Sequence, residues 1–222
     1  MILTLDTSLA DLHIGLFSDD AQPLAEFHHI ASEDDRHIHD ALLAQSTSNL
    51  LIEISASPKD ISKIAIIIGP GSFTGLRIGL SFAKGLAYGL VGRTFSPPVS
   101  LIPLLAHTVL LKQYSMTSDF LQTPDFGLRT SDIGLLYPGY EKDSVYLSMA
   151  DDPENIRYMK LSEVEKLGIK EIISPVEIGL ISHISPIRLI TLAEIASATI
   201  AHRPSTIDDL EPFYGTDFKP GK

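Results

Sequence analysis

Residues 64–92, IAIIIGPGSFTGLRIGLSFAKGLAYGLVG, contain the pattern that decides the fold. Their first five residues, 64–68, are apolar and mostly β-branched, which predicts a short buried strand. Gly69-Pro70-Gly71 ends that strand, because glycine tolerates backbone angles that other residues avoid and proline cannot continue the ladder. Ser72 or Thr74 can then cap a helix that fills most of the remaining stretch. The stretch therefore predicts a strand, a tight turn and a helix.

Small residues form two stripes along the predicted helix. One stripe holds Gly75, Gly79, Ala83 and Ala87, and a second beside it holds Ser81, Gly85 and Gly89. A glycine inside a helix costs about 1 kcal/mol relative to alanine, so another backbone is expected close by. Two interpretations follow: the helix is pressed onto its own sheet, or its small face receives a helix from a second protein. Both can hold, on different faces.

The composition is that of a globular protein without cysteine chemistry. Of 222 residues, 44% are hydrophobic and 20% are charged, and none is cysteine. The missing cysteines exclude disulfides, thiolate catalysis and cysteine-ligated zinc, and they suit a reducing cytosol, so we expect a cytoplasmic protein. We recognise no signal peptide. Arg77 and Lys84 interrupt the longest apolar run, 75–92, which argues against a membrane span.

The charge balance argues against direct nucleic-acid binding as a primary role. Lys and Arg total 17 against 28 Asp and Glu, which gives a formal net charge of −11. Such a surface repels phosphates over most of its area.

Along the whole chain, strands come first and then alternate with helices. Strands are expected at residues 2–5, 12–17, 24–30, 91–95, 133–137, 145–150, 156–161 and 172–173, with helices at 32–54, 101–111, 162–167 and 186–201 and a long loop at 112–131. This order predicts an α/β protein of two related lobes, residues 1–106 and 107–222.

The turn Asp6-Thr7-Ser8 is a candidate for phosphate or Mg²⁺ binding. Between two predicted strands it could place a carboxylate and two hydroxyls around the ligand. The alternative is an Asx turn that satisfies its own backbone. The glycine-rich turn at 69–71 also starts a helix, where anions bind. However, its spacing matches neither the Walker loop nor the dinucleotide fingerprint, and a structural turn is the simpler interpretation.

Patterns for hydrolysis and metal binding are missing. Ser72 does not lie in a G-x-S-x-G elbow, and the S-x-x-K match at 81–84 lacks its companion motifs. The closest histidine pairs are His28-His29 and His37-x-His39, and no H-E-x-x-H occurs, so we expect no metal site.

Three stretches resemble one known family. They are LTLDTS at 3–8, RHIHDALL at 36–43 and GPGSFTGLRIGLSFAKGLA at 69–87. Together they are similar to the TsaB (YeaZ) proteins, accessory subunits of the bacterial machinery that makes threonylcarbamoyladenosine (t6A) at position 37 of tRNA. The resemblance covers roughly residues 1–106 and is thin beyond.

The resemblance implies an actin-like, sugar-kinase-like (ASKHA) fold of two lobes with weak or lost catalytic ability. In the family the subunit pairs with its catalytic paralogue TsaD, the ATPase TsaE joins them, and the same surface can make homodimers. Binding of tRNA is then expected only through the complex, with ATP or ADP and Mg²⁺ at the interface left open.

The family interface is built by the helices that match 36–51 and 72–87. Its members here are Arg36, His37, Asp40, Leu43, Thr47, Gly71, Ser72, Thr74, Gly75, Gly79, Phe82, Ala83 and Ala87. Two rival hypotheses stay open: a nucleotide hydrolase or glycoprotease-like peptidase acting alone, and a scaffold that associates with itself through the face from Gly75 to Ala87.

Overall fold

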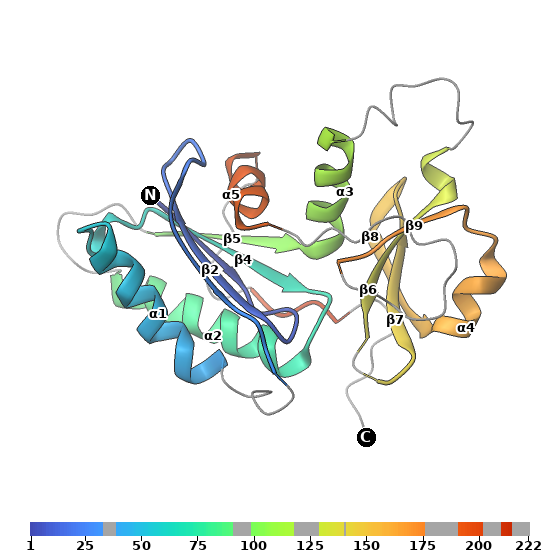
Figure 1. The fold of residues 1–222 in the computed structure, drawn as a ribbon, viewed down its shortest axis with the longest axis horizontal. Helices are drawn as coiled ribbons and strands as arrows, with labels where there is room; N and C mark the ends of the chain where they lie inside the picture. Colours follow the sequence, from blue (N-terminus) through green and yellow to red (C-terminus); the bar gives the residue numbers. More distant parts are fainter. Residues whose placement is uncertain are drawn as a thin grey trace. The chain divides into compact units, whose positions relative to one another are not determined.

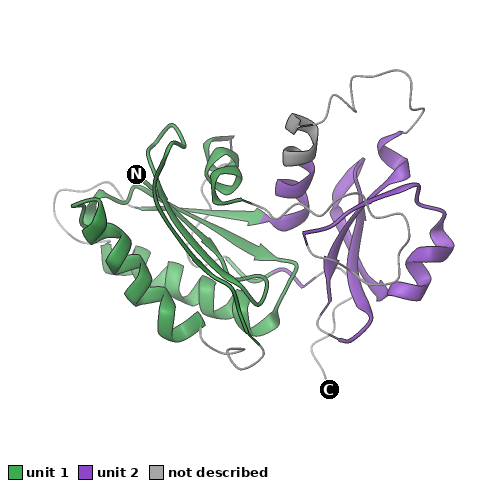
Figure 2. Cartoon of the chain, in the orientation of Figure 1, with its two compact units in different colours: residues 1–104, 191–212 green, residues 105–190, 213–222 purple. Residues whose placement is uncertain are grey.

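A computed structural model describes residues 1–32, 39–90, 99–117, 129–139, 141–175, 191–201 and 210–214. The chain divides into two compact units, shown in Figure 2. Unit 1 comprises residues 1–104 and 191–212, and unit 2 comprises residues 105–190 and 213–222. The first unit thus ends near the predicted lobe boundary but also takes back a segment close to the C-terminus. Within the described residues, no helix is long and apolar enough to cross a membrane.

Unit 1 is built on a five-stranded mixed sheet in the order β3-β2-β1-β4-β5 (Figure 1). The strands are β1 (Ile2–Asp6), β2 (Leu12–Phe17), β3 (Pro23–His29), β4 (Lys63–Gly69) and β5 (Ser100–Leu105). Strands β1, β2 and β3 pair antiparallel in chain order, and β1 pairs parallel with β4. The predicted meander and the buried central strand are confirmed.

Helices cover both faces of this sheet, with α1 and α2 on one side and α5 on the other (Figure 1). They span α1 (His39–Glu53), α2 (Phe73–Leu90) and α5 (Leu192–Ala201). Helix α1 packs on β2, β3 and α2, α2 packs on β4, and α5 packs on β1, β2 and β4. The main core lies under α1 and α2, where Leu5, Ile14 and Ile66 of the sheet meet Leu43 and Leu80 of the helices. Coverage of both faces explains why β4 is a continuous apolar run.

Unit 2 has a smaller four-stranded sheet in the order β8-β7-β6-β9. Its strands are β6 (Ile133–Pro138), β7 (Ser144–Met149), β8 (Asp152–Lys160) and β9 (Glu171–Ile173), and its helices are α3 (Ala106–Thr117) and α4 (Leu161–Val164). Short 3-10 helices lie at Pro58–Asp60, Thr130–Asp132 and Glu165–Leu167. Strand β6 pairs antiparallel with β7 and parallel with β9, so this sheet is mixed as well.

The structure moves both ends of the helix predicted at 101–111. Residues 101–105 are a strand rather than the start of a helix: β5 ends the first sheet, and α3 begins only at Ala106. Short apolar runs do not distinguish a buried strand from a buried helix, which is why the periodicity misled here. Helix α3 also continues to Thr117, into the predicted loop. The predicted strand at 91–95 and the start of the last predicted helix, before 191, lie outside the described residues.

Candidate functional site

The turn that follows β1 is closed by its own residues. Asp6, Thr7 and Ser8 are all buried, with at most 5% of each residue exposed. The Asp6 Oδ1 atom accepts two hydrogen bonds from Ser8, from the backbone N–H at 2.9 Å and from Oγ at 2.5 Å. This geometry is the Asx turn, the alternative to a phosphate or Mg²⁺ site.

The glycine-rich turn after β4 packs directly on this Asx turn. The Ser72 backbone N–H donates to the carbonyl oxygen of Ser8 at 2.7 Å. A Cβ atom at Gly71 would lie 2.3 Å from the same oxygen, and one at Gly75 would lie 2.1 Å from the Thr7 carbonyl oxygen. The glycines at 71 and 75 therefore let the two backbone segments touch.

The first stripe of small residues on α2 faces its own sheet. Gly75, Gly79, Ala83 and Ala87 are all buried within unit 1. A Cβ atom at Gly79 would meet Thr7 Oγ1 at 2.3 Å and Ile66 Cδ1 at 3.3 Å. Of the two interpretations of this stripe, close packing on the chain's own sheet is the one that the contacts support.

The second stripe of α2 faces outward. Ser81, Gly85 and Gly89 are exposed, and a Cβ atom at Gly85 or Gly89 would meet no other atom within 4 Å. Tyr88 on the same side is 50% exposed. No packing inside the described chain accounts for the two glycines, although each weakens the helix. This stripe with Tyr88 is called the outer face of α2 below.

Helix α1 supplies buried anchors and an exposed side. Leu43 and Thr47 are buried, and Thr47 Oγ1 donates to the Leu43 carbonyl oxygen at 2.7 Å. His39, also buried, contacts the Ala10 carbonyl oxygen through Nε2 at 2.7 Å. Asp40 is exposed, and Ile52 is 71% exposed near the end of the helix. The predicted interface residues Arg36 and His37 lie outside the described residues.

The remaining predicted interface residues belong to the start and middle of α2. Ser72 Oγ accepts a hydrogen bond from the Gly75 N–H at 3.2 Å, so Ser72 caps the helix as expected. Thr74 is exposed at the first turn, and Phe82 is half-buried against the core. The interface role of the thirteen predicted residues stays a prediction. The structure nevertheless shows which of these residues are exposed at the surface. The buried ones can affect a partner only through the way the helices pack on the sheet.

A row of titratable side chains crosses the sheet on the face away from α1 and α2. Asp6 of β1 lies opposite His13 of β2, which lies opposite His28 of β3. The two imidazole rings are 5.0 Å apart in an edge-to-face arrangement. Burial lowers the pKa of His13, although the Asp6 carboxylate opposes this shift. Among the described residues, no group of three or more His, Asp and Glu side chains could hold a metal ion.

The sequence did not predict which of the two small-residue stripes of α2 is exposed. Both stripes were visible as spacings of four residues, but spacing alone does not say which one meets the sheet. The bulky neighbours carry that signal: Leu76 and Leu80 are buried beside the first stripe, whereas Arg77 and Lys84 flank the second. The row from Asp6 to His28 had no sequence signal, because it depends on strand register.

Comparison with known proteins gives two kinds of match. Residues 29–96, which include α1, β4 and α2, match the family described as TsaD, tRNA N6-adenosine threonylcarbamoyltransferase. The chain is also 37% identical over 89 residues to the tRNA threonylcarbamoyladenosine biosynthesis protein TsaB of Bacillus subtilis. That match covers 40% of this chain and 37% of the relative's length.

Solved structures match almost the entire chain at low identity. A Pseudomonas aeruginosa protein described as uncharacterized, with similarity to peptidase YEAZ, matches with a TM-score of 0.64 and 16% identity, covering 96% of this chain and 98% of that one. YeaZ from the same organism matches with a TM-score of 0.63, also at 16% identity and with the same coverage. These likenesses show that the chain shares the α/β fold of the YeaZ structures, with two mixed sheets and flanking helices. The two sequence matches support the TsaB (YeaZ) resemblance.

Proposed function

We propose that this chain is a member of the TsaB (YeaZ) family, as its sequence matches support, and that it is a non-catalytic partner subunit in tRNA t6A modification at adenosine 37. It binds a TsaD-like catalytic subunit through the outer face of α2 together with the exposed side of α1. The observation that carries this proposal is the pair Gly85 and Gly89, which weaken α2 although a Cβ atom at either position would meet no described residue within 4 Å. Both lie in the segment that matches the TsaD family model.

Small side chains on this face suit a helix as the partner. Glycine and serine let two helix backbones approach closely, so that many dispersion contacts form over a short length. Tyr88 offers a large flat surface at the edge of the same face, and aromatic side chains are frequent anchors in interfaces. The buried stripe from Gly75 to Ala87 acts indirectly, because it fixes the depth at which α2 sits on the sheet.

The charge and the Asx turn favour a supporting role over chemistry. A chain with a net charge of −11 needs a partner to hold tRNA. The Asp6 carboxylate is engaged by Ser8, so the turn does not present it to a substrate. No arrangement of side chains among the described residues favours the hydrolase or peptidase alternative. Three further parts of this proposal rest on the resemblance: TsaE as a third subunit, a homodimer through the helix face, and ATP or ADP with Mg²⁺ at the interface. A cytoplasmic location is proposed from the absence of cysteine.

The test is binding to the TsaD homologue encoded in the same genome. We expect the two purified proteins to co-elute in size-exclusion chromatography, and we expect Gly85→Leu to abolish the complex. Leucine has a better helix propensity than glycine, so this change does not unfold α2. Leu167→Gln is the matched control, because Leu167 is 48% exposed in unit 2. Absence of a wild-type complex, or unchanged binding of Gly85→Leu, would contradict the proposal.

A further inference from the structure

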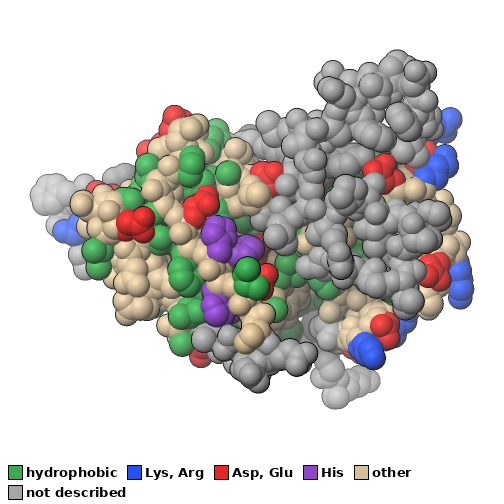
Figure 3. Space-filling view, in the orientation of Figure 1, with side chains coloured by type: hydrophobic (Ala, Val, Ile, Leu, Met, Phe, Trp, Pro, Cys, Tyr) green, Lys and Arg blue, Asp and Glu red, His purple; other side chains and the backbone are tan. Residues whose placement is uncertain are grey.

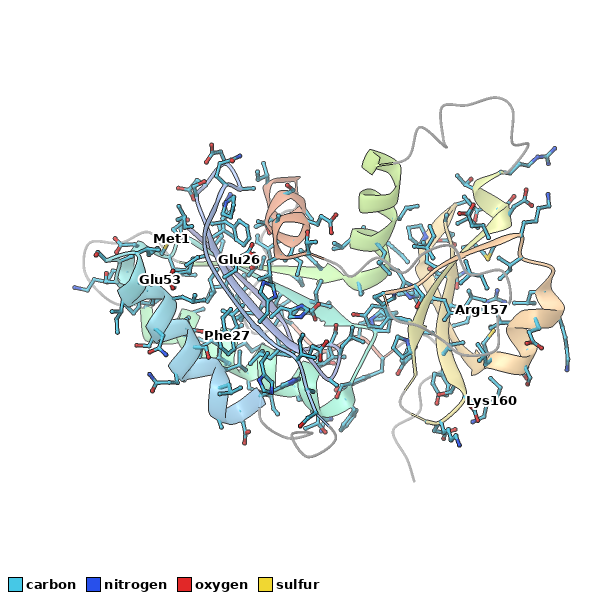
Figure 4. All side chains as sticks on the ribbon, in the orientation of Figure 1. Met1, Glu26, Phe27, Glu53, Arg157 and Lys160 are labelled. Carbon is cyan, nitrogen blue, oxygen red and sulfur yellow. The ribbon has the colours of Figure 1, made fainter. Side chains whose placement is uncertain are left out.

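The two helices of the proposed docking surface carry charges of opposite sign. Helix α1 contains Asp40 and Glu53 and no Lys or Arg, whereas α2 contains Arg77 and Lys84 and no Asp or Glu. Glu53, labelled in Figure 4, is the last residue of α1. Figure 3 shows acidic side chains scattered over the visible face of unit 1, where those of Lys and Arg are scarce. The basic character of α2 is therefore local, in a chain whose net charge is −11.

Both basic residues of α2 lie on its outer side. Arg77 is exposed, and Lys84, seven positions later, is half-buried. Because seven residues make almost two full turns, the two side chains fall on one line along the helix. Tyr88, which is 50% exposed, continues this line one turn further. Arg77, Lys84 and Tyr88 are called the basic ridge below, and the ridge runs beside the glycines of the outer face of α2.

Arg77 is positioned by an aromatic ring of the same helix. Its Cζ atom lies 3.9 Å from the centre of the Phe73 ring, one turn earlier in α2. A guanidinium over an aromatic face is attracted by the negative potential of that face, and the contact restricts the conformations of the arginine. A side chain that is already restricted loses less entropy when it binds. The planar guanidinium also presents its N–H donors as a fork that matches a carboxylate.

The helices themselves do not explain this distribution of charge. Acidic side chains stabilise the first turn of a helix and basic ones the last turn. Asp40 in the first turn of α1 fits this rule, but Glu53 stands in the last turn of α1, and α2 has neither an acid in its first turn nor a base in its last. Asp40, Glu53 and Lys84 form no ion pair with any described residue. The charges of the two helices are therefore better placed for a second protein than for the helices that carry them.

We propose that the basic ridge binds an acidic helix of the partner, with one carboxylate at Arg77 and a second at Lys84. This proposal rests on the proposed function and specifies which kind of helix of the TsaD-like subunit lies on α2. The two carboxylates are expected about seven residues apart, or about 10 Å along the partner helix, because that is the spacing of the two cations at 1.5 Å per residue. Gly85 and Gly89 beside the ridge leave room for the backbone of that helix.

The acids of α1 determine where the acidic helix can lie. If the helix shifted toward α1, its carboxylates would approach Asp40 or Glu53, and like charges brought together at an interface are unfavourable. Attraction at α2 and repulsion at α1 together select one placement. A second copy of this chain is a poorer occupant of the ridge, because two α2 helices packed on each other offer no carboxylate to Arg77.

The first experiment measures the Kd for the TsaD homologue by isothermal titration calorimetry at physiological salt. We expect Arg77→Glu and Lys84→Glu each to raise Kd about tenfold, because each change replaces an attraction by a repulsion inside the interface. Arg77→Gln, which only removes the charge, should lie between Arg77→Glu and the wild type. Lys59→Glu is the matched control: it makes the same change in net charge at an exposed site of unit 1 outside both helices, and Kd should stay within about twofold. Glutamate is a good helix former, and urea denaturation verifies that each variant is folded.

The second experiment identifies the partner segment. A photoreactive benzoylphenylalanine replaces Tyr88 at the end of the ridge, and mass spectrometry identifies the peptide of the TsaD homologue that becomes linked to it. We expect a helical segment with Asp or Glu at two positions about seven residues apart. Changing those two acids to lysine should restore binding to the double variant Arg77→Glu with Lys84→Glu, because the charges are then exchanged rather than removed.

Three results would overturn the acidic helix and leave the proposed function standing. They are wild-type affinity in both Arg77→Glu and Lys84→Glu, a loss in Lys59→Glu as large as in those variants, and a linked segment without acidic residues. A link to a second copy of this chain in place of the TsaD homologue would overturn it as well. Failure of the proposed function looks different: the wild-type chain then forms no complex, or Gly85→Leu binds like the wild type.

Discussion

Gly79 lies so close to Thr7 that a Cβ atom on the glycine would sit 2.3 Å from the threonine Oγ1. The hydroxyl is buried and has no hydrogen-bond partner among the described residues. The contact joins the turn after β1 to the middle of α2, and it fixes how deeply the helix rests on the sheet. A glycine that is costly in an isolated helix is thus required by the fold.

The two kinds of glycine on α2 should respond oppositely to alanine. Gly79→Ala forces Thr7 or the helix to move, and we expect a loss of about 1–3 kcal/mol in the free energy of unfolding. Gly85→Ala meets open space and removes backbone freedom from the unfolded chain, so we expect a gain of about 1 kcal/mol. Urea denaturation of both variants beside the wild type measures the difference. Equal effects at the two sites would contradict the packing described here.

Gly71 should be less tolerant still. Its Cβ would lie 2.3 Å from the backbone carbonyl oxygen of Ser8, and a backbone atom cannot rotate away as a side chain can. We expect Gly71→Ala to be more destabilising than Gly79→Ala, and to lower the melting temperature by several degrees or more. Gly89→Ala is the matched control because its Cβ position is open. Differential scanning fluorimetry of the three variants ranks them, and a Gly71→Ala protein as stable as the wild type would show that the two turns do not depend on this approach.

The Asp6 carboxylate should matter for stability rather than for turnover. Asp6→Ala removes the carboxylate that accepts two buried hydrogen bonds from Ser8, which should cost about 1–3 kcal/mol. Asp6→Asn keeps one oxygen acceptor and should cost less. Asp151→Ala, an exposed carboxylate in unit 2, serves as the control. Chemical denaturation gives the three values, and an unchanged stability of Asp6→Ala would mean that the Asx turn is not what holds this loop.

The local pattern predicted most of unit 1 because its signals are short-range. The apolar run 64–68, the Gly-Pro-Gly break and the capping serine each act over a few residues, and the structure has the expected strand, turn and helix. The strand at β5 was missed because a short apolar run is ambiguous, and only pairing in the sheet decides it. Helix α5 comes after most of unit 2 in sequence but belongs to unit 1, where it packs on β1, β2 and β4. A contact between segments so distant in sequence leaves no local pattern.

For the candidate site, the sequence showed the two stripes of α2 but not their surroundings. Spacing placed Gly75 and Gly79 on one side and Gly85 and Gly89 on another. Which side meets the sheet depends on the position of Thr7, which is distant from Gly79 in sequence but touches it in the fold. Surface exposure therefore had to come from the structure.

Stability of unit 2 should fall in mild acid because of His107. Its ring is fully buried at the start of α3, 2.8 Å from Ser148 Oγ of β7 and edge-on to Tyr137 of β6. Burial lowers the pKa of His107 from 6.5 to about 3. The folded form therefore stays neutral while the unfolded chain takes up a proton, so the unfolded state binds more protons below about pH 6.5. Stability is then fully present above that pH and declines as the pH falls toward 3, by at most about 1.4 kcal/mol per pH unit.

The measurement is urea denaturation at pH 7, 6 and 5, with unfolding monitored by the near-ultraviolet circular dichroism of tyrosine. Three tyrosines (Tyr137, Tyr146 and Tyr158) lie side by side across the sheet of unit 2. In the double variant His107→Leu with Ser148→Ala, neither polar group remains to be buried alone, and the dependence on pH between 7 and 5 should become shallower. Ser148→Ala alone keeps the histidine and should keep the wild-type slope. If the double variant loses stability in acid as steeply as the wild type, protonation of His107 does not drive the decline. The half-buried His13 in unit 1, whose pKa is also lowered by burial, then becomes the group to replace next.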